Sequence, residues 1–393
     1  MLYLSGIIIT FFLSVILAGK KGKSQSDIIL NVWLAITCLH FVMFYMFITS
    51  ALIHFPHLLG FELPLPLMYS PFLYLYAASL THKRPLKLNS LLHFLPALGM
   101  YALLIPFFLL PPAQKIYVYQ HEGEGFEWLT EINRYAIIAS GVTYIVLTLL
   151  MLRRHRRKIK DEFSNTEKIN LNWLRYLAYG TSAIWIVIII GLRDEWIYTT
   201  AAVFVFFLGY FGIRQVGIFS NIHPKTEPRG SSALLQEVQT NPIVKTDAES
   251  SKSKSREVIA EAKVKYQKSA LTEEDAMKIH QRLKAVMMHE TLFKDPELTL
   301  ADVAEKLGVH PNILSQVINS VEKKSFYDYI NGLRIKEFKK ITSLPDHRQF
   351  TLLALAFECG FNSKTAFNRN FKKATGLSPT EYLNQQQVIL AGA

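Results

Sequence analysis

Long runs of apolar residues in the first 217 positions constrain the fold of this 393-residue chain more than any other feature. A helix that crosses a bilayer needs about 20 mostly apolar residues, because the hydrocarbon interior cannot satisfy an exposed backbone. Seven stretches come near that length, at roughly 2–18, 28–50, 66–80, 90–110, 135–152, 172–191 and 196–213. The stretch 66–80 is the weakest, since it is short and contains Pro66 and Pro71. The sequence therefore predicts a seven-span helical bundle over residues 1–217.

The composition of the whole chain combines this apolar half with a second half that is typical of a soluble protein. Apolar residues make up 50% of the chain and charged residues 19%, compared with about 25% charged residues in ordinary soluble domains. So many apolar residues exclude a disordered chain. Cys38 and Cys359 are too few for a disulfide framework or a thiolate zinc site. The formal net charge of +12 indicates an anionic partner, either a membrane surface or a nucleic acid.

The basic residues between the apolar stretches predict the orientation in the membrane, because cytoplasmic loops carry an excess of Lys and Arg. The first, third and fifth connections hold thirteen of them, seven of which lie between 153 and 168. The even connections hold three, which are Lys115, Arg134 and Arg193. We therefore expect the amino terminus outside the cell and the carboxyl half in the cytoplasm. No basic residue precedes the first apolar run, so a cleaved signal peptide is not expected.

The membrane half offers few groups for chemistry. His54 and His57 are three residues apart, but Pro56 lies between them and no neighbouring carboxylate or cysteine completes a metal site. We see no charged residue deep inside the spans, which disfavours a pump or ion-coupled transporter. The outer connection 111–134 is acidic and long, and it either covers a ligand pocket or is a solvated loop. No cofactor and no metal ion is expected.

A polar segment at 218–255, rich in Ser, Lys, Thr and Glu, separates the two halves and is expected to be a flexible tether. Residues 299–320 then follow the pattern of a helix-turn-helix. Thr299 can cap a first helix, Gly308 permits the turn, and His310 or Pro311 opens a second helix. An ordinary corner of two helices would show the same pattern, so this segment alone leaves both interpretations open.

A second copy of the pattern at 351–374 favours the helix-turn-helix. Thr351 caps, Gly360 turns and Phe361 fills the angle between the helices, while Phe367 and Phe371 face inward. The second helix of this copy carries four basic residues and no acidic one. The segment between the copies, SFYDYINGLRIKEFKKI, is expected to be a helix that acts as a rigid spacer.

These pieces together resemble the DNA-binding domain of the AraC-type (AraC/XylS) transcription regulators. The segments LTLADVAEKLGVHPNILSQVIN, FYDYINGLRIKEFKK and AFECGFNSKTAFNRNFKKATGLSPTEY carry the resemblance in order and spacing, over about residues 266–386. The whole chain is similar to a membrane-bound bacterial subgroup with an N-terminal multi-span domain. Many members have Gly near Lys323 or Lys324, and Arg at the position of Leu383. The resemblance implies an all-α chain with a linker at 218–265, a seven-helix DNA-binding domain with two helix-turn-helix units at 266–386, and a tail at 387–393.

The resemblance also implies that the second helix of each copy enters the major groove of DNA. Carried over by position, the candidate DNA-binding residues are Asn312, Ser315 and Gln316 in the first copy, and Lys364, Thr365 and Arg369 in the second. Gln can pair with adenine, and Arg or Lys with guanine. Lys372 and Lys373 are expected to contact phosphates, which adds affinity without sequence preference. Asn362 and Ser363 are candidates to cap the second recognition helix.

The sequence contains no nucleotide-binding glycine loop and no HExxH zinc motif, so we do not expect an enzyme. The favoured function is a one-component transcription regulator in the inner membrane of a bacterium. The alternative is a multi-span receptor or small-molecule transporter with a cytosolic domain that binds protein. The expected partners are duplex DNA, the lipid bilayer, RNA polymerase, an unknown signal ligand and a second copy in a homodimer. A signal would act either by changing the presentation of two DNA-binding domains or by proteolytic release of them.

Overall fold

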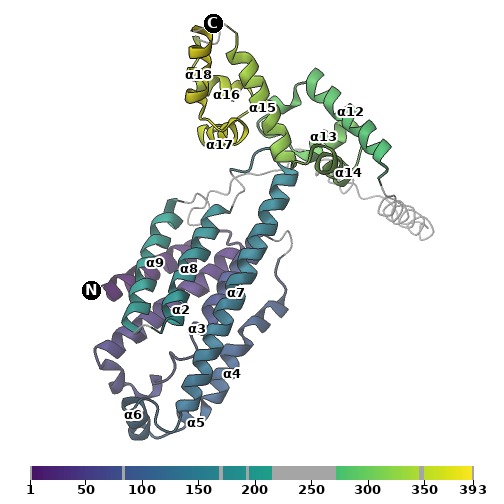
Figure 1. Ribbon diagram of the computed structural model, residues 1–393. Coiled ribbons are helices and arrows are strands. Elements are labelled where there is room, and N and C mark those ends of the chain that lie inside the picture. Colours follow the sequence, from purple (N-terminus) through teal and green to yellow (C-terminus); the bar gives the residue numbers. More distant parts are fainter. Residues whose placement is uncertain are drawn as a thin grey trace, which may run out of the picture. The chain divides into compact units, whose positions relative to one another are not determined.

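The computed structural model describes residues 2–81, 85–167, 171–191, 194–214, 271–344 and 349–391. Nearly all of these residues are helical (Figure 1), and within them the only strand-like feature is an isolated antiparallel bridge between Phe163 and Thr299. The prediction of an all-α fold is therefore confirmed for the described residues. The predicted linker at 218–265 lies outside the described residues.

The described residues form two compact units. The first unit holds residues 2–155 and 171–214, and the second holds 156–167 together with 271–391. The short piece 156–167 comes from the connection that follows the fifth apolar stretch, yet it belongs with the carboxyl half. Its contacts are described below.

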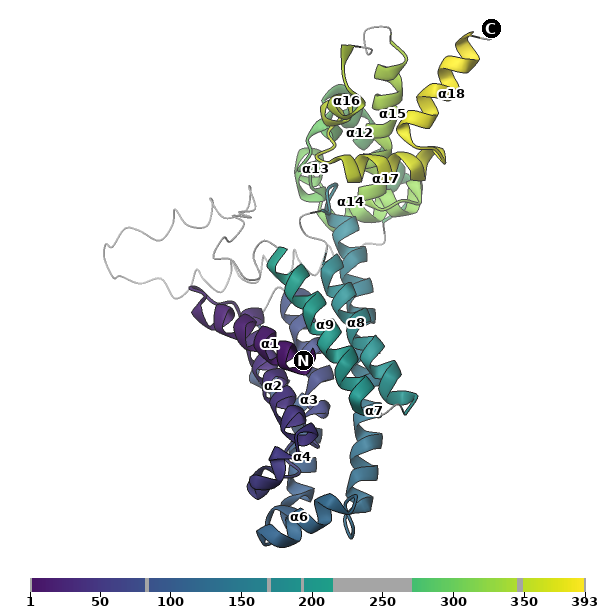
Figure 2. The ribbon, with the colours of Figure 1, turned by 90° about the vertical axis from the view of Figure 1, so that its left-hand side faces the viewer.

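The first unit is a bundle of helices joined by short turns (Figures 1 and 2). Its α-helices are α1 (Leu2–Gly19), α2 (Gln25–Ile48), α3 (Pro66–Thr81), α4 (Leu95–Leu103), α5 (Ile105–Phe108), α6 (Pro112–Gln120), α7 (Glu127–Glu162), α8 (Asn172–Ile189) and α9 (Asp194–Arg214). The short helical turns are η1 (Ala51–His54), η2 (Pro56–Leu58) and η3 (Leu88–Phe94).

The predicted number of seven membrane spans is not reproduced. In the described part of the chain, three helices are long and apolar enough to cross a membrane, namely α1, α2 and α7. The stretch 90–110 is divided among η3, α4 and α5, and the break at Leu104 comes two residues before Pro106. Proline lacks the N–H that a continuing helix needs. Helix α3 has only 16 residues, and among the described side chains the apolar stretches of α8 and α9 cover Trp173–Ile189 and Glu195–Phe207. Of these stretches only 90–110 is interrupted, while 66–80, 172–191 and 196–213 each correspond to one continuous helix, α3, α8 and α9.

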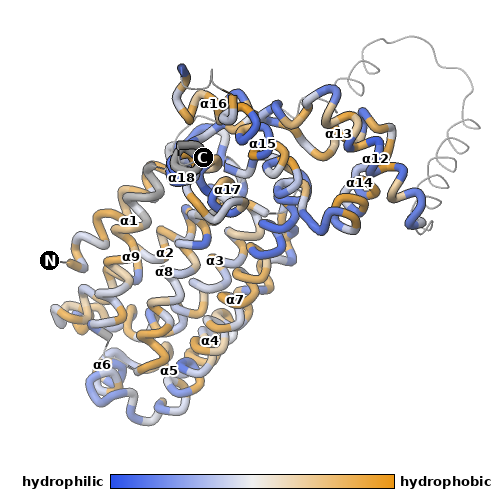
Figure 3. Tube along the Cα trace, turned by 45° about the horizontal axis from the view of Figure 1, so that its top comes forward, coloured by the Kyte–Doolittle hydropathy of each residue, from blue (hydrophilic) through white to orange (hydrophobic). Residues whose placement is uncertain are grey.

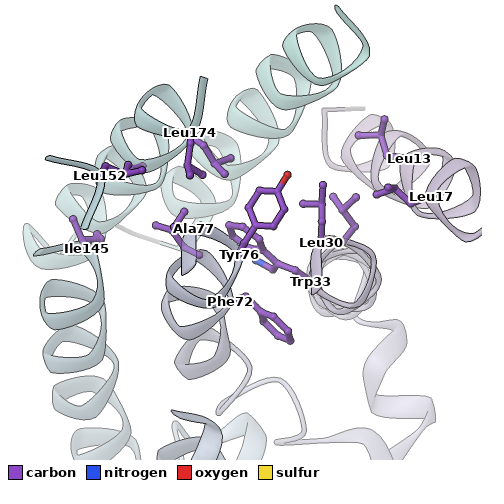
Figure 4. Packing of buried hydrophobic residues seen from close by; sticks show 14 of the residues in the cluster. Leu13, Leu17, Leu30, Trp33, Phe72, Tyr76, Ala77, Ile145, Leu152 and Leu174 are labelled. Carbon is purple, nitrogen blue, oxygen red and sulfur yellow. The ribbon is translucent and has the colours of Figure 1, made fainter. Parts of the chain in front are cut away.

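Side chains from five helices form the main core of the first unit. Leu13 and Leu17 of α1 and Leu30 of α2 pack in one cluster with Tyr76 of α3 and Leu174 of α8 (Figure 4). Helix α7 adds Ile145 and Leu152 to the same cluster. The turn between α1 and α2 is held by a buried ion pair, in which Lys20 Nζ lies 2.9 Å from an Asp27 carboxylate oxygen.

Hydrophobic residues predominate along the helices of the first unit (Figure 3), and many of them have exposed side chains. On α1, Ile8, Phe11 and Phe12 are 59%, 63% and 57% exposed, and Ile190 after α8 is 66% exposed. Exposure of so many large apolar side chains would be unfavourable in water. This surface is suited to contact with lipid.

The second unit consists of seven α-helices within its described residues. They are α12 (Glu273–His289), α13 (Leu300–Leu307), α14 (Pro311–Val317), α15 (Phe326–Thr342), α16 (Leu352–Glu358), α17 (Lys364–Thr375) and α18 (Pro379–Ala391). A 3₁₀ turn, η4 (Leu292–Lys294), precedes α13, and a π-helical turn, η5 (Ile318–Glu322), follows α14.

Helix α15 joins two separate cores of the second unit. Its first half contributes Phe326 and Ile330 to a cluster with α12, α13 and α14. Its second half contributes Ile335 and Phe338 to a cluster with α16 and α17. Because each half of α15 packs in its own core, the helix fixes the two helix pairs relative to each other, as expected for a rigid spacer.

Candidate nucleic-acid interface

The first helix pair of the second unit is built by local hydrogen bonds. The Thr299 hydroxyl accepts from the Asp302 N–H at 3.2 Å, and an Asp302 carboxylate oxygen accepts from the Thr299 N–H at 2.9 Å, which closes a capping box at the start of α13. Gly308 ends the helix in the left-handed region with φ 63°. His310 then caps α14, because its Nδ1 accepts from the Asn312 N–H at 3.2 Å.

The second helix pair repeats the same construction. Thr351 caps α16 by accepting from the Ala354 N–H at 3.1 Å, and Ser363 caps α17 by accepting from the Ala366 N–H at 3.0 Å. Gly360 makes the turn with φ 94°. Of the two candidate caps at the start of α17, Ser363 therefore makes the side-chain bond.

The two turns contain equivalent backbone hydrogen bonds. The Gly308 N–H donates to the Glu305 carbonyl at 3.0 Å, and the Gly360 N–H donates to the Phe357 carbonyl at 2.9 Å. In the next position, the Val309 N–H donates to the Ala304 carbonyl at 3.0 Å and the Phe361 N–H to the Ala356 carbonyl at 3.1 Å. Both accepting alanines are completely buried, so no larger side chain separates the two helices of either pair. The structure thus contains two helix-turn-helix units of equivalent geometry.

The turn before α15 contains Lys323, near which many members of the resembled family have a glycine. The backbone of Lys323 adopts φ 54°, in the left-handed region that glycine reaches without steric cost. A residue with a Cβ atom pays about 1–2 kcal/mol for this conformation. The chain therefore keeps the turn geometry although it lacks the glycine.

The candidate base-reading side chains lie on the solvent side of α14 and α17. Asn312 and Gln316 are exposed on α14, and Ser315 is half-buried and accepts a hydrogen bond from Asn319 at 3.4 Å. On α17 the exposed candidates are Lys364, Thr365, Arg369, Lys372 and Lys373. The opposite faces of these helices are buried through Leu314 and Phe367. The orientation is compatible with a DNA-facing surface, and the individual contacts stay predictions.

Two of these basic side chains have partners at the start of α15. The Arg369 guanidinium donates to the Tyr327 hydroxyl at 2.9 Å, and the Asn370 amide donates to the same hydroxyl at 2.7 Å. Lys373 Nζ lies 2.7 Å from an Asp328 carboxylate oxygen. Nothing in the sequence pattern singles out Tyr327 or Asp328, since neither is adjacent to a recognition helix. Both become visible only when α15 is packed against α17.

The first unit contains a mostly apolar cavity of about 250 Å³, whose lining includes the polar residues Thr37, His40, Tyr69, Thr181 and Tyr198. It is lined by residues of α2, α3, α7, α8 and α9, including Trp33, Ile137 and Trp185. His40 on α2 forms hydrogen bonds of 2.5 Å with the Tyr69 hydroxyl and 2.6 Å with the Tyr198 hydroxyl. The sequence interpretation missed His40, although an ionisable residue inside an apolar stretch is itself a signal of function.

The predicted outer connection 111–134 contributes to a second cavity. Helix α6 and the following turn pack against residues 51–65 in a cluster that includes Leu59 and Phe107. The cavity between them measures about 190 Å³, and Glu62 and Glu122 are among its lining residues. Residues of this connection line the cavity, and its role as the cover of a ligand pocket stays a prediction. Among the described residues, no group of three or more potential metal ligands comes together, and His54 and His57 form no such group.

Comparison with known proteins finds sequences that are similar to the second unit. A model of the helix-turn-helix domain family matches residues 303–385. The melibiose operon regulatory protein of Escherichia coli (strain K12) is 32% identical over 95 residues, which is 24% of this chain and 30% of that protein. The HTH-type transcriptional regulator YobQ of Bacillus subtilis (strain 168) is 30% identical over 110 residues, which is 28% of this chain and 44% of that protein.

The regulator YijO of Escherichia coli (strain K12) is 32% identical over 88 residues, which is 22% of this chain and 30% of that protein. This chain thus spans less than half the length of the curated relatives that it matches. No solved structure matches the chain. The duplicated helix-turn-helix and these matches together show that the C-terminal domain of this chain belongs to the AraC-type helix-turn-helix domains of transcription regulators.

Proposed function

We propose that this protein is a membrane-anchored one-component transcription regulator, which binds specific duplex DNA through α14 and α17. The observation that carries the proposal is the pair of equivalent helix-turn-helix units, fixed to each other by α15, with polar and basic side chains on both exposed faces. In this function the second unit lies in the bacterial cytoplasm, where it reaches both the chromosome and RNA polymerase. Two chains in a homodimer would present four recognition helices to neighbouring half-sites.

The DNA-binding residues are tested by comparing Arg369→Ala with Lys373→Ala in the full-length protein. Arg369→Ala should cost about 1–3 kcal/mol of binding free energy and relax the preference at one base pair, because Arg recognises guanine through two hydrogen bonds. Lys373→Ala should weaken all DNA sequences alike and lower the slope of log affinity against log salt by about one. Competition binding against randomised operator positions, measured at several salt concentrations, separates the two effects.

Lys278→Ala is a suitable control, since Lys278 pairs with Glu274 on the exposed face of α12, outside both helix-turn-helix units. It should leave both the affinity and the base preference as in the wild type. Equal binding to all DNA sequences by the wild-type protein would exclude direct base reading, and it would favour a receptor or transporter whose cytosolic domain binds protein.

The membrane anchor is proposed to consist of the helices of the first unit, with the amino terminus outside and the second unit inside. The exposed apolar side chains of α1 and α8 and the basic connection at 153–168 support this orientation. In a Cys38→Ala background, Glu124→Cys should react with an impermeant maleimide on intact cells. Arg157→Cys should react only after the cells are opened. Both positions are exposed, so a reaction pattern opposite to this one would contradict the orientation.

The signal is proposed to be a small, mostly apolar molecule with a single polar group, bound in the cavity beside His40. A neutral imidazole has one N–H and one acceptor nitrogen, so one of the two tyrosines donates to His40 while the other accepts from it. These three side chains therefore offer hydrogen bonding in a wall that is otherwise mostly apolar, with Thr37 and Thr181 as further polar residues of the lining. The volume, about 250 Å³, lies just below the range of about 300–1,000 Å³ that is typical of ligand pockets, so the ligand would be small.

Filling the cavity should abolish the response to the signal. Ala201 lines the cavity, so Ala201→Phe should give a protein that still binds its operator DNA but holds the target promoter at one constant output. A reporter gene measured under growth conditions that change the wild-type output checks this. Val203→Phe on the same helix is the matched control, because Val203 is 57% exposed and is not part of the cavity lining. A normal response of Ala201→Phe would rule out this cavity as the signal site.

A further inference from the structure

The end of helix α7 and the loop after it are part of the DNA-binding unit. Residues 156–167 cluster with the second unit, although residues 2–155 cluster with the first. Helix α7 itself is continuous from Glu127 to Glu162. We refer to residues 156–167 as the docking segment. A single helix therefore begins in the membrane unit and ends within the DNA-binding unit.

Ser164 anchors the docking segment and is only 1% exposed. Its hydroxyl donates to the Leu298 carbonyl at 2.6 Å, and its N–H donates to the same carbonyl at 3.2 Å. Its own carbonyl accepts from the Asn331 amide at 3.0 Å. The neighbouring Phe163 forms the antiparallel bridge with Thr299, the residue that caps α13. The segment thus pairs with the backbone at the entrance to the first helix-turn-helix unit.

Ser164 also completes the hydrogen bonds of a buried arginine on α15. Arg334 is 2% exposed, and its guanidinium donates to the carbonyls of Phe293 and Asp295 at 2.7 Å each. The same guanidinium donates to the Ser164 hydroxyl at 3.2 Å and to the Asn331 side-chain oxygen at 3.2 Å. A buried charge is tolerated only when its donors are satisfied. The docking segment therefore supplies one of the partners that keep Arg334 in place.

A second contact connects the docking segment to the recognition helix α17. The Lys160 ammonium lies 5.5 Å from the centre of the Tyr327 ring, and the Tyr327 hydroxyl accepts from Arg369 and Asn370. Asp328 and Lys373 also lie close enough to Lys160 to interact with its charge. Lys160 thus shares its surroundings with the side chains that hold α17 against α15.

We infer that the docking segment is the regulatory connection of this protein, through which helix α7 stabilises α15 and, with it, the arrangement of the two helix-turn-helix units that α15 holds. The docking segment, residues 156–167 of this chain, binds a surface of the second unit. This surface is formed by Leu298, Thr299, Asn331 and Arg334. The inference rests on the proposed function and names the route of its regulation. Helix α7 also lines the cavity beside His40 through Ile137, so a ligand in that cavity contacts the same helix that docks on α15.

The physical advantage of this route is stiffness. A helix of 36 residues extends about 54 Å and passes a displacement from one end to the other. The polar segment 218–255, if it is a flexible tether as its composition predicts, transmits orientation poorly. In the docked state α7 holds α15 and α17 in the arrangement that binds DNA, and release of the segment weakens binding.

The test uses the full-length protein in lipid nanodiscs with Cys38→Ala. Cys359 is left in place, because it is completely buried and burial raises the pKa of its thiol to about 12. Phe163→Cys combined with Thr299→Cys should form a disulfide under mild oxidation. Residues opposite each other in an antiparallel bridge have Cα atoms about 4.5–5.5 Å apart, within the range that a disulfide spans. Phe163→Cys combined with Thr351→Cys is the matched control, since Thr351 is the equivalent cap of the second unit.

Undocking is tested by Ser164→Leu, which removes the hydroxyl and overfills a buried site. It should weaken binding to operator DNA at least tenfold, and Asn165→Leu, one residue further, should change it less than twofold. Adding Phe163→Cys and Thr299→Cys to Ser164→Leu should restore binding after oxidation, which a merely misfolded variant would not show. Lengthening the segment 218–255 by about 20 Gly and Ser residues should leave the affinity unchanged.

The inference is overturned if the wild-type protein binds its operator while the bridge cysteines fail to crosslink. It is also overturned if Ser164→Leu binds as tightly as the wild type, or if oxidation fails to restore binding in the bridged variant. These outcomes leave the proposed function intact. Absence of sequence-specific binding by the wild-type protein would instead remove the proposed function itself.

Discussion

Replacement of Gly360 by alanine is expected to destabilise the second helix-turn-helix unit by about 3 kcal/mol or more. A Cβ atom at this position would lie 2.6 Å from the Phe293 carbonyl oxygen and 2.7 Å from the Lys294 carbonyl oxygen. Both are main-chain atoms, so no flexible side chain can move aside. The strain of φ 94° for a residue with a Cβ, about 1–2 kcal/mol, adds to an overpacking cost of about 1–3 kcal/mol.

Gly308→Ala provides the internal comparison for this prediction. Gly308 occupies the equivalent turn with φ 63°, but nothing lies within 4 Å of the position that its Cβ would take. Its replacement should therefore cost only the backbone strain, about 1–2 kcal/mol. Amide hydrogen exchange in α16 and α17, compared with exchange in α13 and α14, gives the local free energies of opening. Equal costs for the two substitutions would show that the contact between the Gly360 turn and residues 293–294 is absent in solution.

Arg334→Met is expected to cost about 3–5 kcal/mol, because it removes the donors of several buried acceptors at once. The carbonyls of Phe293 and Asp295 would each lose a hydrogen bond in a region from which water is excluded. Since small domains are stable by only about 5–15 kcal/mol, such a loss should partly unfold the domain at growth temperature. Slower exchange or an unchanged exchange rate at α15 would contradict the role assigned to Arg334.

Arg282→Met is the matched control for Arg334→Met. Arg282 also donates to a main-chain carbonyl, that of Leu307, but its side chain is largely exposed. Water replaces the lost donor there, so the expected cost is about 1 kcal/mol or less. Exchange rates of the α13 and α15 amides, measured in both variants, compare the two arginines directly.

The features that the sequence predicted correctly in the second unit are those set by local chemistry. The caps at Thr299 and Thr351 and the turns at Gly308 and Gly360 depend on residues within a few positions of each other. Such bonds form in the same way in any chain with this pattern. The pattern of apolar positions likewise predicted that Phe367 and Phe371 face a core, and both are buried.

The features that the sequence did not reveal depend on contacts between distant segments. Ser164 and Arg334 are 170 positions apart, and each looks like an ordinary surface residue beside its neighbours in the sequence. Tyr327 can accept a hydrogen bond from Arg369 only because α15 packs against α17. The predicted span at 90–110 was wrong for a related reason, since a window of apolar residues ignores where Pro106 interrupts the helix.

The most direct test of the central claim is sequencing of the DNA that is crosslinked to the intact protein in living cells and recovered from the membrane fraction. Wild-type protein should enrich a small set of sites that share a motif, with two contacted segments separated by about 34 Å, or one turn of the double helix. Arg369→Ala should lose or relax one position of that motif. Recovery of DNA without any shared motif, or motif-containing DNA found only with a soluble fragment and never with the full-length membrane protein, would contradict the account.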